Sequence, residues 1–125
     1  MIKLQIYDFS GQKKFSSVIN PYYKKSDGIL LVFDITQESS FIALNDWITI
    51  IKEKAPQANI ILVGQKCDLF ERVISEEKIT ELTEEFGIEY FETSAKNDYN
   101  INELFDNLIQ QCMYNNYEAP DIGAI

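Results

Sequence analysis

The stretch Asn59-Ile60-Ile61-Leu62-Val63-Gly64-Gln65-Lys66-Cys67-Asp68 decides the fold and holds the first candidate site. Its apolar run, Ile60 to Val63, is rich in β-branched residues and too short for a helix. Such a run is typical of a strand that is buried on both faces of a parallel sheet. Polar groups follow directly after Gly64. Because a parallel sheet binds ligands just beyond the carboxyl ends of its strands, the sequence predicts a binding site here.

Lys66 and Asp68 in this loop suit a planar base. The stem of a lysine can lie along a ring, and a carboxylate can accept two parallel N–H bonds. Guanine offers that pair of donors on its N1–N2 edge, and adenine does not. A motif of four residues is a weak signal, however, and a solvated loop after a core strand is an equally open interpretation.

A chain of 125 residues, of which 46% are hydrophobic, is sufficient for one packed domain. The net charge of −9 argues against non-specific nucleic-acid binding and against electrostatic docking on anionic lipid. The absence of His excludes His-based triads and His metal ligands. Cys67 and Cys112 have neither disulfide nor metal-site spacing, so we expect a reduced, cytoplasmic setting. No apolar run is long enough for a signal peptide or a membrane span.

Strand and helix patterns alternate along the chain. We expect strands at Met1–Tyr7, Gly28–Phe33, Ile60–Val63 and Ile88–Phe91, with helices after the capping residues Thr36, Ser75 and Asn100. The first strand alternates apolar and polar residues, which is typical of a position near a sheet edge. This order predicts an α/β fold, with a mostly parallel sheet flanked by helices on both faces. We expect a domain over residues 1–114 and a polar C-terminal tail over 115–125.

Three loops that follow predicted strands carry polar residues: Asp8–Gln12, Gln65–Asp68 and Thr93–Lys96. In a parallel sheet these loops meet at one rim. Asp8 could reach a metal-bound phosphate through water, and the backbone N–H of Gly11 could reach it directly. Gln12 could orient an attacking water. Ser94 and Ala95 could present donors to a base carbonyl.

With these loops the chain resembles about the last two-thirds of a Rab-type small GTPase of the Ras superfamily, from Lys3 to about Met113. The segments that carry the resemblance are Lys3 to Gln12 (Lys-Leu-Gln-Ile-Tyr-Asp-Phe-Ser-Gly-Gln), Asp27 to Asp34, Gly64 to Leu69, and Glu92-Thr93-Ser94-Ala95-Lys96. The resemblance implies an incomplete Ras-like P-loop GTPase fold. It also implies a guanine-nucleotide switch in vesicle transport, with GTP or GDP and Mg²⁺ as cofactors.

The resemblance also implies roles for single residues. Lys66 would stack on guanine, Asp68 would bind its N1–N2 edge, and Ala95 would contact the base carbonyl. The implied nucleotide-binding residues are Asp8, Gly11, Gln65, Lys66, Asp68, Ser94, Ala95 and Lys96, with Asp8 reaching the metal through water and Gln12 catalytic. For Lys96 a solvated loop lysine is equally open, and for Gln12 a polar residue in a mobile loop is the alternative.

The sequence departs from the family pattern in several places. It contains no G-x-x-x-x-G-K-[ST] phosphate loop, which supplies the cradle for the triphosphate. Gln65 stands where the family has Asn, and the substitution of Phe9-Ser10 for a small pair puts effector binding through the Asp8–Lys25 region in doubt. The last residues contain no cysteine for a prenyl anchor. We therefore expect a fragment or truncated form that binds GTP weakly or not at all, and hydrolyses it at the background rate.

A protein without the family's first strand and first helix has a gap in its fold. In the family a strand lies between those expected at Met1–Tyr7 and Gly28–Phe33, so the sheet would either split or pair these two directly. The absent helix would uncover an apolar face of Gly28–Phe33 and Ile60–Val63, which favours a partner or self-association. The alternative function is therefore a degenerate, non-catalytic protein-interaction module derived from a GTPase.

Overall fold

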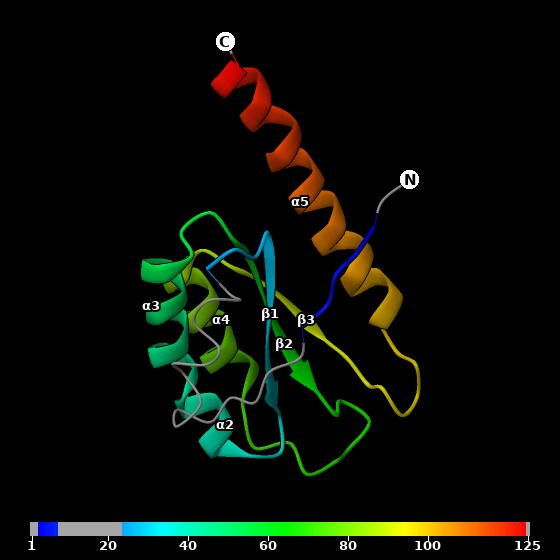
Figure 1. The fold of residues 1–125 in the computed structure, drawn as a ribbon. Coiled ribbons are helices and arrows are strands. Elements are labelled where there is room, and N and C mark those ends of the chain that lie inside the picture. Colours follow the sequence, from blue (N-terminus) through cyan, green and yellow to red (C-terminus); the bar gives the residue numbers. More distant parts are fainter. Residues whose placement is uncertain (1–2, 8–23, 125) are drawn as a thin grey trace.

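The computed structural model describes residues 3–7 and 24–124, without the side chains of residues 115–124. Its elements are β1 (Gly28–Asp34), α2 (Glu38–Ile42), α3 (Leu44–Lys54), β2 (Asn59–Gln65), α4 (Glu76–Phe86), β3 (Glu89–Glu92) and α5 (Ile101–Ala124), as labelled in Figure 1. In the described residues the strands form one parallel sheet in the order β1-β2-β3. The register pairs Asp34 with Gln65 and Gly64 with Glu92, so the strands end at a common rim.

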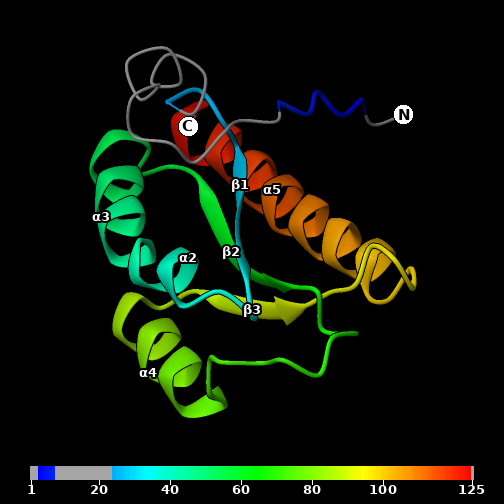
Figure 2. The same cartoon turned by 90° about the horizontal axis from the view of Figure 1, so that it is seen from below.

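Helices cover both faces of this sheet. Figure 2 shows α2, α3 and α4 on one side and α5 on the other. The predicted α/β class with a parallel sheet between helices is confirmed.

The central strand β2 explains why the sheet has two covered faces. Ile61 and Leu62 are both fully buried, although successive side chains of a strand point to opposite faces. Leu62 packs with Leu44 and Ile48 of α3, whereas Ile61 packs with Leu104 of α5. The unbroken apolar run that predicted a doubly covered strand therefore has an apolar partner on each side.

The helix caps follow the sequence in α4 but not before α2. The hydroxyl of Ser75 accepts the N–H of Lys78, and Gly87 ends α4 in the left-handed conformation at φ +64°. The expectation that Thr36 caps the next helix is wrong, since Gln37 stands at that position without a side-chain cap. The hydroxyl of Thr36 donates instead to the carboxylate of Asp34, at 2.6 Å.

The predicted strand at Met1–Tyr7 is wrong over the part that is described. Lys3–Tyr7 has no strand assignment, and Leu4, Ile6 and Tyr7 are 51%, 68% and 54% exposed. An alternating segment becomes a strand only when a neighbour pairs with its backbone and covers its apolar side. In the described residues β1 pairs only with β2, and Lys3–Tyr7 does not pair with the other edge of β1. Neither expected outcome, a split sheet or direct pairing with β1, is seen in the described residues: β1, β2 and β3 form one sheet, and Lys3–Tyr7 does not join it.

The expected uncovered face exists on β1 but not on β2. Val32, in the middle of an otherwise apolar strand, is 49% exposed. Ile61 and Val63 of β2 lie on the same face and are buried under Leu104. Helix α5 therefore covers the centre of the sheet and the start of β1, where Leu108 lies against Gly28, and leaves the Val32 end of β1 open.

The end of α5 carries no indication of a membrane span. The helix continues to Ala124, through the stretch expected as a polar tail (Figure 1). Within the described residues no helix is both long enough and apolar enough to cross a bilayer.

Candidate functional site

The loops that follow β2 and β3 are joined by their backbones. The N–H of Thr93 donates to the carbonyl of Gly64 at 2.8 Å, and the N–H of Cys67 donates to the carbonyl of Thr93 at 3.1 Å. The second bond lies beyond the last paired residues of the strands, so it continues the connection into the loops. Two of the three loops expected at one rim therefore lie side by side.

A side-chain bond fixes the carboxylate of Asp68 in this rim. The hydroxyl of Ser94 donates to Oδ1 of Asp68 at 2.7 Å, and Ser94 is only 1% exposed. The same hydroxyl accepts the N–H of Asn97 at 3.2 Å. Backbone bonds in both directions between Ser94 and Tyr99 close the loop that contains Ala95. Asp68 thus has a defined orientation rather than that of a mobile surface acid.

A cavity of about 470 Å³ adjoins this pair and is lined by Cys67, Asp68, Glu92, Ser94, Asn97 and Tyr99. It is an open, shallow depression, and its lining does not include Lys66, Ala95 or Lys96. Another cavity, of about 410 Å³, lies at the opposite end of the sheet beside Gly87 and Lys52, and contains none of the predicted site residues. We place the candidate binding site at the rim beside the first depression, because polar groups from two strand ends converge there.

Cys67 lines the same cavity but is a poor nucleophile. Burial raises the pKa of its thiol, and the carboxylates of Glu92 and Asp68 raise it further. A thiol held in its protonated form neither attacks electrophiles nor binds metals readily. Among the described residues there is no group of His, Cys, Asp and Glu side chains suited to a metal ion.

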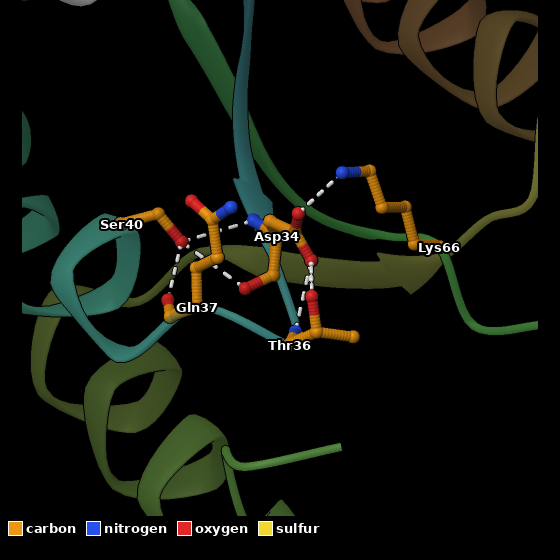
Figure 3. Close-up of polar contacts among 5 residues, drawn as sticks. All are labelled: Asp34, Thr36, Gln37, Ser40 and Lys66. Carbon is orange, nitrogen blue, oxygen red and sulfur yellow. Dashed lines mark hydrogen bonds and ion pairs between the residues drawn. The ribbon is translucent and has the colours of Figure 1, made fainter. Parts of the chain in front are cut away.

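Lys66 directly follows β2, and its side chain reaches across to Asp34 at the end of β1. Its backbone has φ +67°, which is uncommon for a residue with a side chain. Its ammonium lies 2.6 Å from Oδ2 of Asp34, as Figure 3 shows. The Asp34 side chain is 7% exposed and that of Lys66 is 47% exposed. The ion pair therefore joins a buried carboxylate to a lysine at the surface.

An ion pair between Arg72 and Glu92 connects the loops that follow β2 and β3. Arg72 places Nη1 2.5 Å from Oε1 of Glu92 and donates from Nε to the carbonyl of Ile74 at 2.8 Å. The hydroxyl of Tyr90 donates to the same Glu92 oxygen at 2.8 Å. Arg72 follows the first loop in sequence and Glu92 precedes the second, so their ion pair connects the bases of the two loops.

The chain matches a family model described as the Ras family over residues 1–114. The chain belongs to the Ras family. It is 46% identical over 110 residues to the Ras-related protein Rab-3C of Bos taurus, and this match covers 86% of the chain and 48% of the relative. It is 40% identical over 111 residues to Rab-3 of Caenorhabditis elegans, covering 87% of the chain and 51% of the relative. The chain spans about half the length of these curated relatives.

The Rab-type resemblance inferred from the motifs is thereby confirmed. For this Ras-family chain, the structure joins the loop that contains Lys66 and Asp68 to the loop that contains Ser94 and Ala95. A side-chain bond connects Asp68 with Ser94, whereas the Lys66 side chain bonds to Asp34. Gln65 ends β2 opposite Asp34, and Lys96 is exposed beside Ala95. The predicted metal-linked residue Asp8, together with Gly11 and Gln12, lies outside the described residues.

Sequence reasoning missed Asp34, Arg72 and Glu92 as parts of the site. Asp34 ends a buried parallel strand, so the rule that pointed to the loop after β2 applied to it equally well. Arg72 had no such signal, because nothing in a single sequence shows which acid a loop arginine meets. Glu92 directly precedes the Thr93–Lys96 motif, and that pattern assigns no contact to its carboxylate.

Proposed function

We propose that this chain supplies the base-recognition part of a Rab-type guanine-nucleotide switch that acts in vesicle transport. The observation that carries the proposal is the bond from the buried hydroxyl of Ser94 to Asp68, at a rim where two strand-end loops are joined. It fixes an acceptor group on the surface that the family motifs assign to guanine.

The bound carboxylate of Asp68 suits the N1–N2 edge of guanine. An ionised carboxylate has about four lone-pair sites, and the Ser94 hydroxyl uses one of them. The remaining sites can accept two parallel N–H bonds, which are stronger to a charged acceptor than to a neutral one. Adenine has no such donor pair, so its complex with Asp68 would leave the carboxylate poorly bonded.

The neighbouring residues complete the base site in this proposal. The stem of Lys66 covers one face of the ring, Lys96 flanks it, and the backbone N–H of Ala95 donates to the base carbonyl. Ala95 and Lys96 are both exposed, so a ligand at the rim can reach them. Gln65 braces the loop in place of the family's Asn, with one methylene more.

The phosphate side of the proposal belongs to Asp8, Gly11 and Gln12. In a complete switch Mg²⁺ would neutralise phosphate charge, with Gln12 placing the water for GTP hydrolysis. Among the described residues no cluster of acidic side chains fits a metal ion. The 125 residues contain no phosphate loop, and we expect background hydrolysis by this chain alone.

The base site can be tested with guanosine, which lacks phosphates. We expect the amide signals of Lys66, Asp68 and Ala95 to shift in a ¹⁵N NMR titration with guanosine at about millimolar affinity, equivalent to about 4 kcal/mol. Adenosine should shift them much less. Asp68→Ala should abolish the response, whereas Glu71→Ala, which removes an exposed acid from the same loop, should preserve it. Equal responses to both nucleosides would refute the proposal.

One observation favours the interaction module as a second candidate. Val32 is exposed on β1, and the edge of β1 has only one strand neighbour in the described structure, so this exposed edge is a surface on which a further strand could pair. If this surface mediates self-association, sedimentation equilibrium should show oligomers that Val32→Lys disrupts. A monomer at high micromolar concentration would exclude self-association through this face.

A further inference from the structure

Asp34 ends the Asp27–Asp34 segment that resembles the family, but no role was assigned to it above. Its carboxylate holds the lysine that the proposed function places on the base. Asp34 Oδ2 lies 2.6 Å from Nζ of Lys66. The two residues are 32 positions apart in sequence, on the ends of neighbouring strands. Figure 3 shows the Lys66 side chain extending toward the end of β1 to reach this carboxylate.

The carboxylate of Asp34 is itself held rigidly. Its Oδ1 accepts the backbone N–H of Thr36 at 2.9 Å and the Thr36 hydroxyl at 2.6 Å. The hydroxyl of Ser40 accepts the N–H of Asp34 at 3.0 Å and so fixes its backbone. Burial alone would raise the pKa of Asp34, but the bonds from Lys66 and Thr36 outweigh it and hold this pKa below its ordinary value. Asp34 is therefore a fixed, ionised anchor.

The backbone of Lys66 is consistent with a fixed side-chain direction. A lysine at φ +67° occupies a region that residues with a side chain seldom adopt, and such conformations gather at functional sites. Both ends of the side chain are thus defined, the Cα by an unusual backbone and the ammonium by a buried carboxylate. The methylene stem of this half-exposed side chain lies between the two fixed ends.

We propose that Asp34 is a positioning residue for guanine recognition, which holds the ammonium of Lys66 so that its stem forms a fixed platform for one face of the base. The inference rests on the proposed function and adds a residue to it. A free lysine loses much of its rotational freedom when it packs against a ligand, which reduces affinity. A lysine already held by Asp34 has lost that freedom before binding, so we expect the ion pair to raise the affinity for guanosine about three- to tenfold.

A double-mutant cycle with guanosine tests this role. Asp34→Asn should weaken binding about three- to tenfold, as followed by the NMR shift of Ala95. Lys66→Met keeps an unbranched stem but cannot bind Asp34, and guanosine carries no charge for the ammonium to attract. Lys66→Met should therefore show a similar loss, and adding Asp34→Asn to it should cause no further loss. Glu84→Gln, which removes an exposed acid at the far end of α4, should bind as the wild type does.

Each outcome separates the inference from the proposed function. If the wild type binds guanosine and both Asp34→Asn and Lys66→Met bind equally well, Asp34 has no positioning role but the base site stands. If Asp34→Asn weakens binding equally in the Lys66→Met background, Asp34 acts through the fold and the inference fails. If Asp34→Asn does not fold, the exposed Lys66→Met alone decides, and wild-type affinity in that variant overturns the inference. If the wild type shows no response to guanosine, the proposed function and the inference fail together.

Discussion

Removing the guanidinium of Arg72 should destabilise the site and the fold together. Arg72→Met keeps much of the apolar stem but removes the 2.5 Å ion pair with Glu92 and the bond to the Ile74 carbonyl. Both side chains of the pair are 28% exposed. The pair therefore lies between a surface salt bridge, worth about 0.2–1 kcal/mol, and a buried pair, where loss of one partner costs about 3–5 kcal/mol.

Two neighbouring interactions of Arg72 and Glu92 narrow the expected loss of stability for Arg72→Met. Glu92 keeps the bond from the Tyr90 hydroxyl in the variant, which limits the loss. Nη2 of Arg72 is buried without a hydrogen-bond partner, a cost of about 1 kcal/mol or more that the variant no longer carries. We expect Arg72→Met to lower the free energy of unfolding by about 2 kcal/mol.

Urea unfolding followed by fluorescence of Trp47, the single tryptophan, measures this change. Glu92→Gln should lose a similar amount, and the double variant should lose less than the sum of the two, because both changes break the same pair. A loss below about 0.5 kcal/mol for Arg72→Met would show that the ion pair does not hold the loops.

Two further predictions follow from close packing and from charge. Gly64→Ala should lower the free energy of unfolding by about 1–3 kcal/mol in the same urea assay, because a Cβ there would overlap the Tyr90 hydroxyl and approach Ile35 Cγ2 to 2.9 Å; an unchanged midpoint would contradict the packing. Because the pKa of Asp34 is lower in the folded chain than its ordinary value, its ionisation stabilises the fold fully above about pH 4, and this stabilisation is lost as the pH falls through the lowered pKa. Wild-type stability should therefore fall more steeply below pH 4 than that of Asp34→Asn, and parallel acid profiles would argue against the ionised anchor.

The sheet could be predicted from sequence where burial and pattern agree. The unbroken run in β2 required cover on both faces and has it from α3 and α5. Ser75 and Gly87 also acted as expected, because capping depends on neighbours within a few residues.

Elements that depend on distant partners were not predictable in this way. Lys3–Tyr7 has the alternation of a strand but no strand beside it, and pattern alone does not supply one. The Thr36 hydroxyl could accept an N–H at the start of the next helix or donate to the carboxylate of Asp34. It donates to Asp34, because a bond to a charged acceptor is stronger. The site shows the same limit, since the Asp34–Lys66 contact joins residues that no local rule connects.

The arrangement of the rim loops around a guanine base is tested most directly by an isotope-filtered NOE spectrum of the labelled chain with guanosine. The proposed site predicts contacts from the base proton of guanosine to the side-chain methylenes of Lys66 and to the backbone of Ala95, with none from adenosine. Contacts instead with residues of the cavity beside Gly87, or the same contacts from both nucleosides, would contradict guanine recognition at this rim.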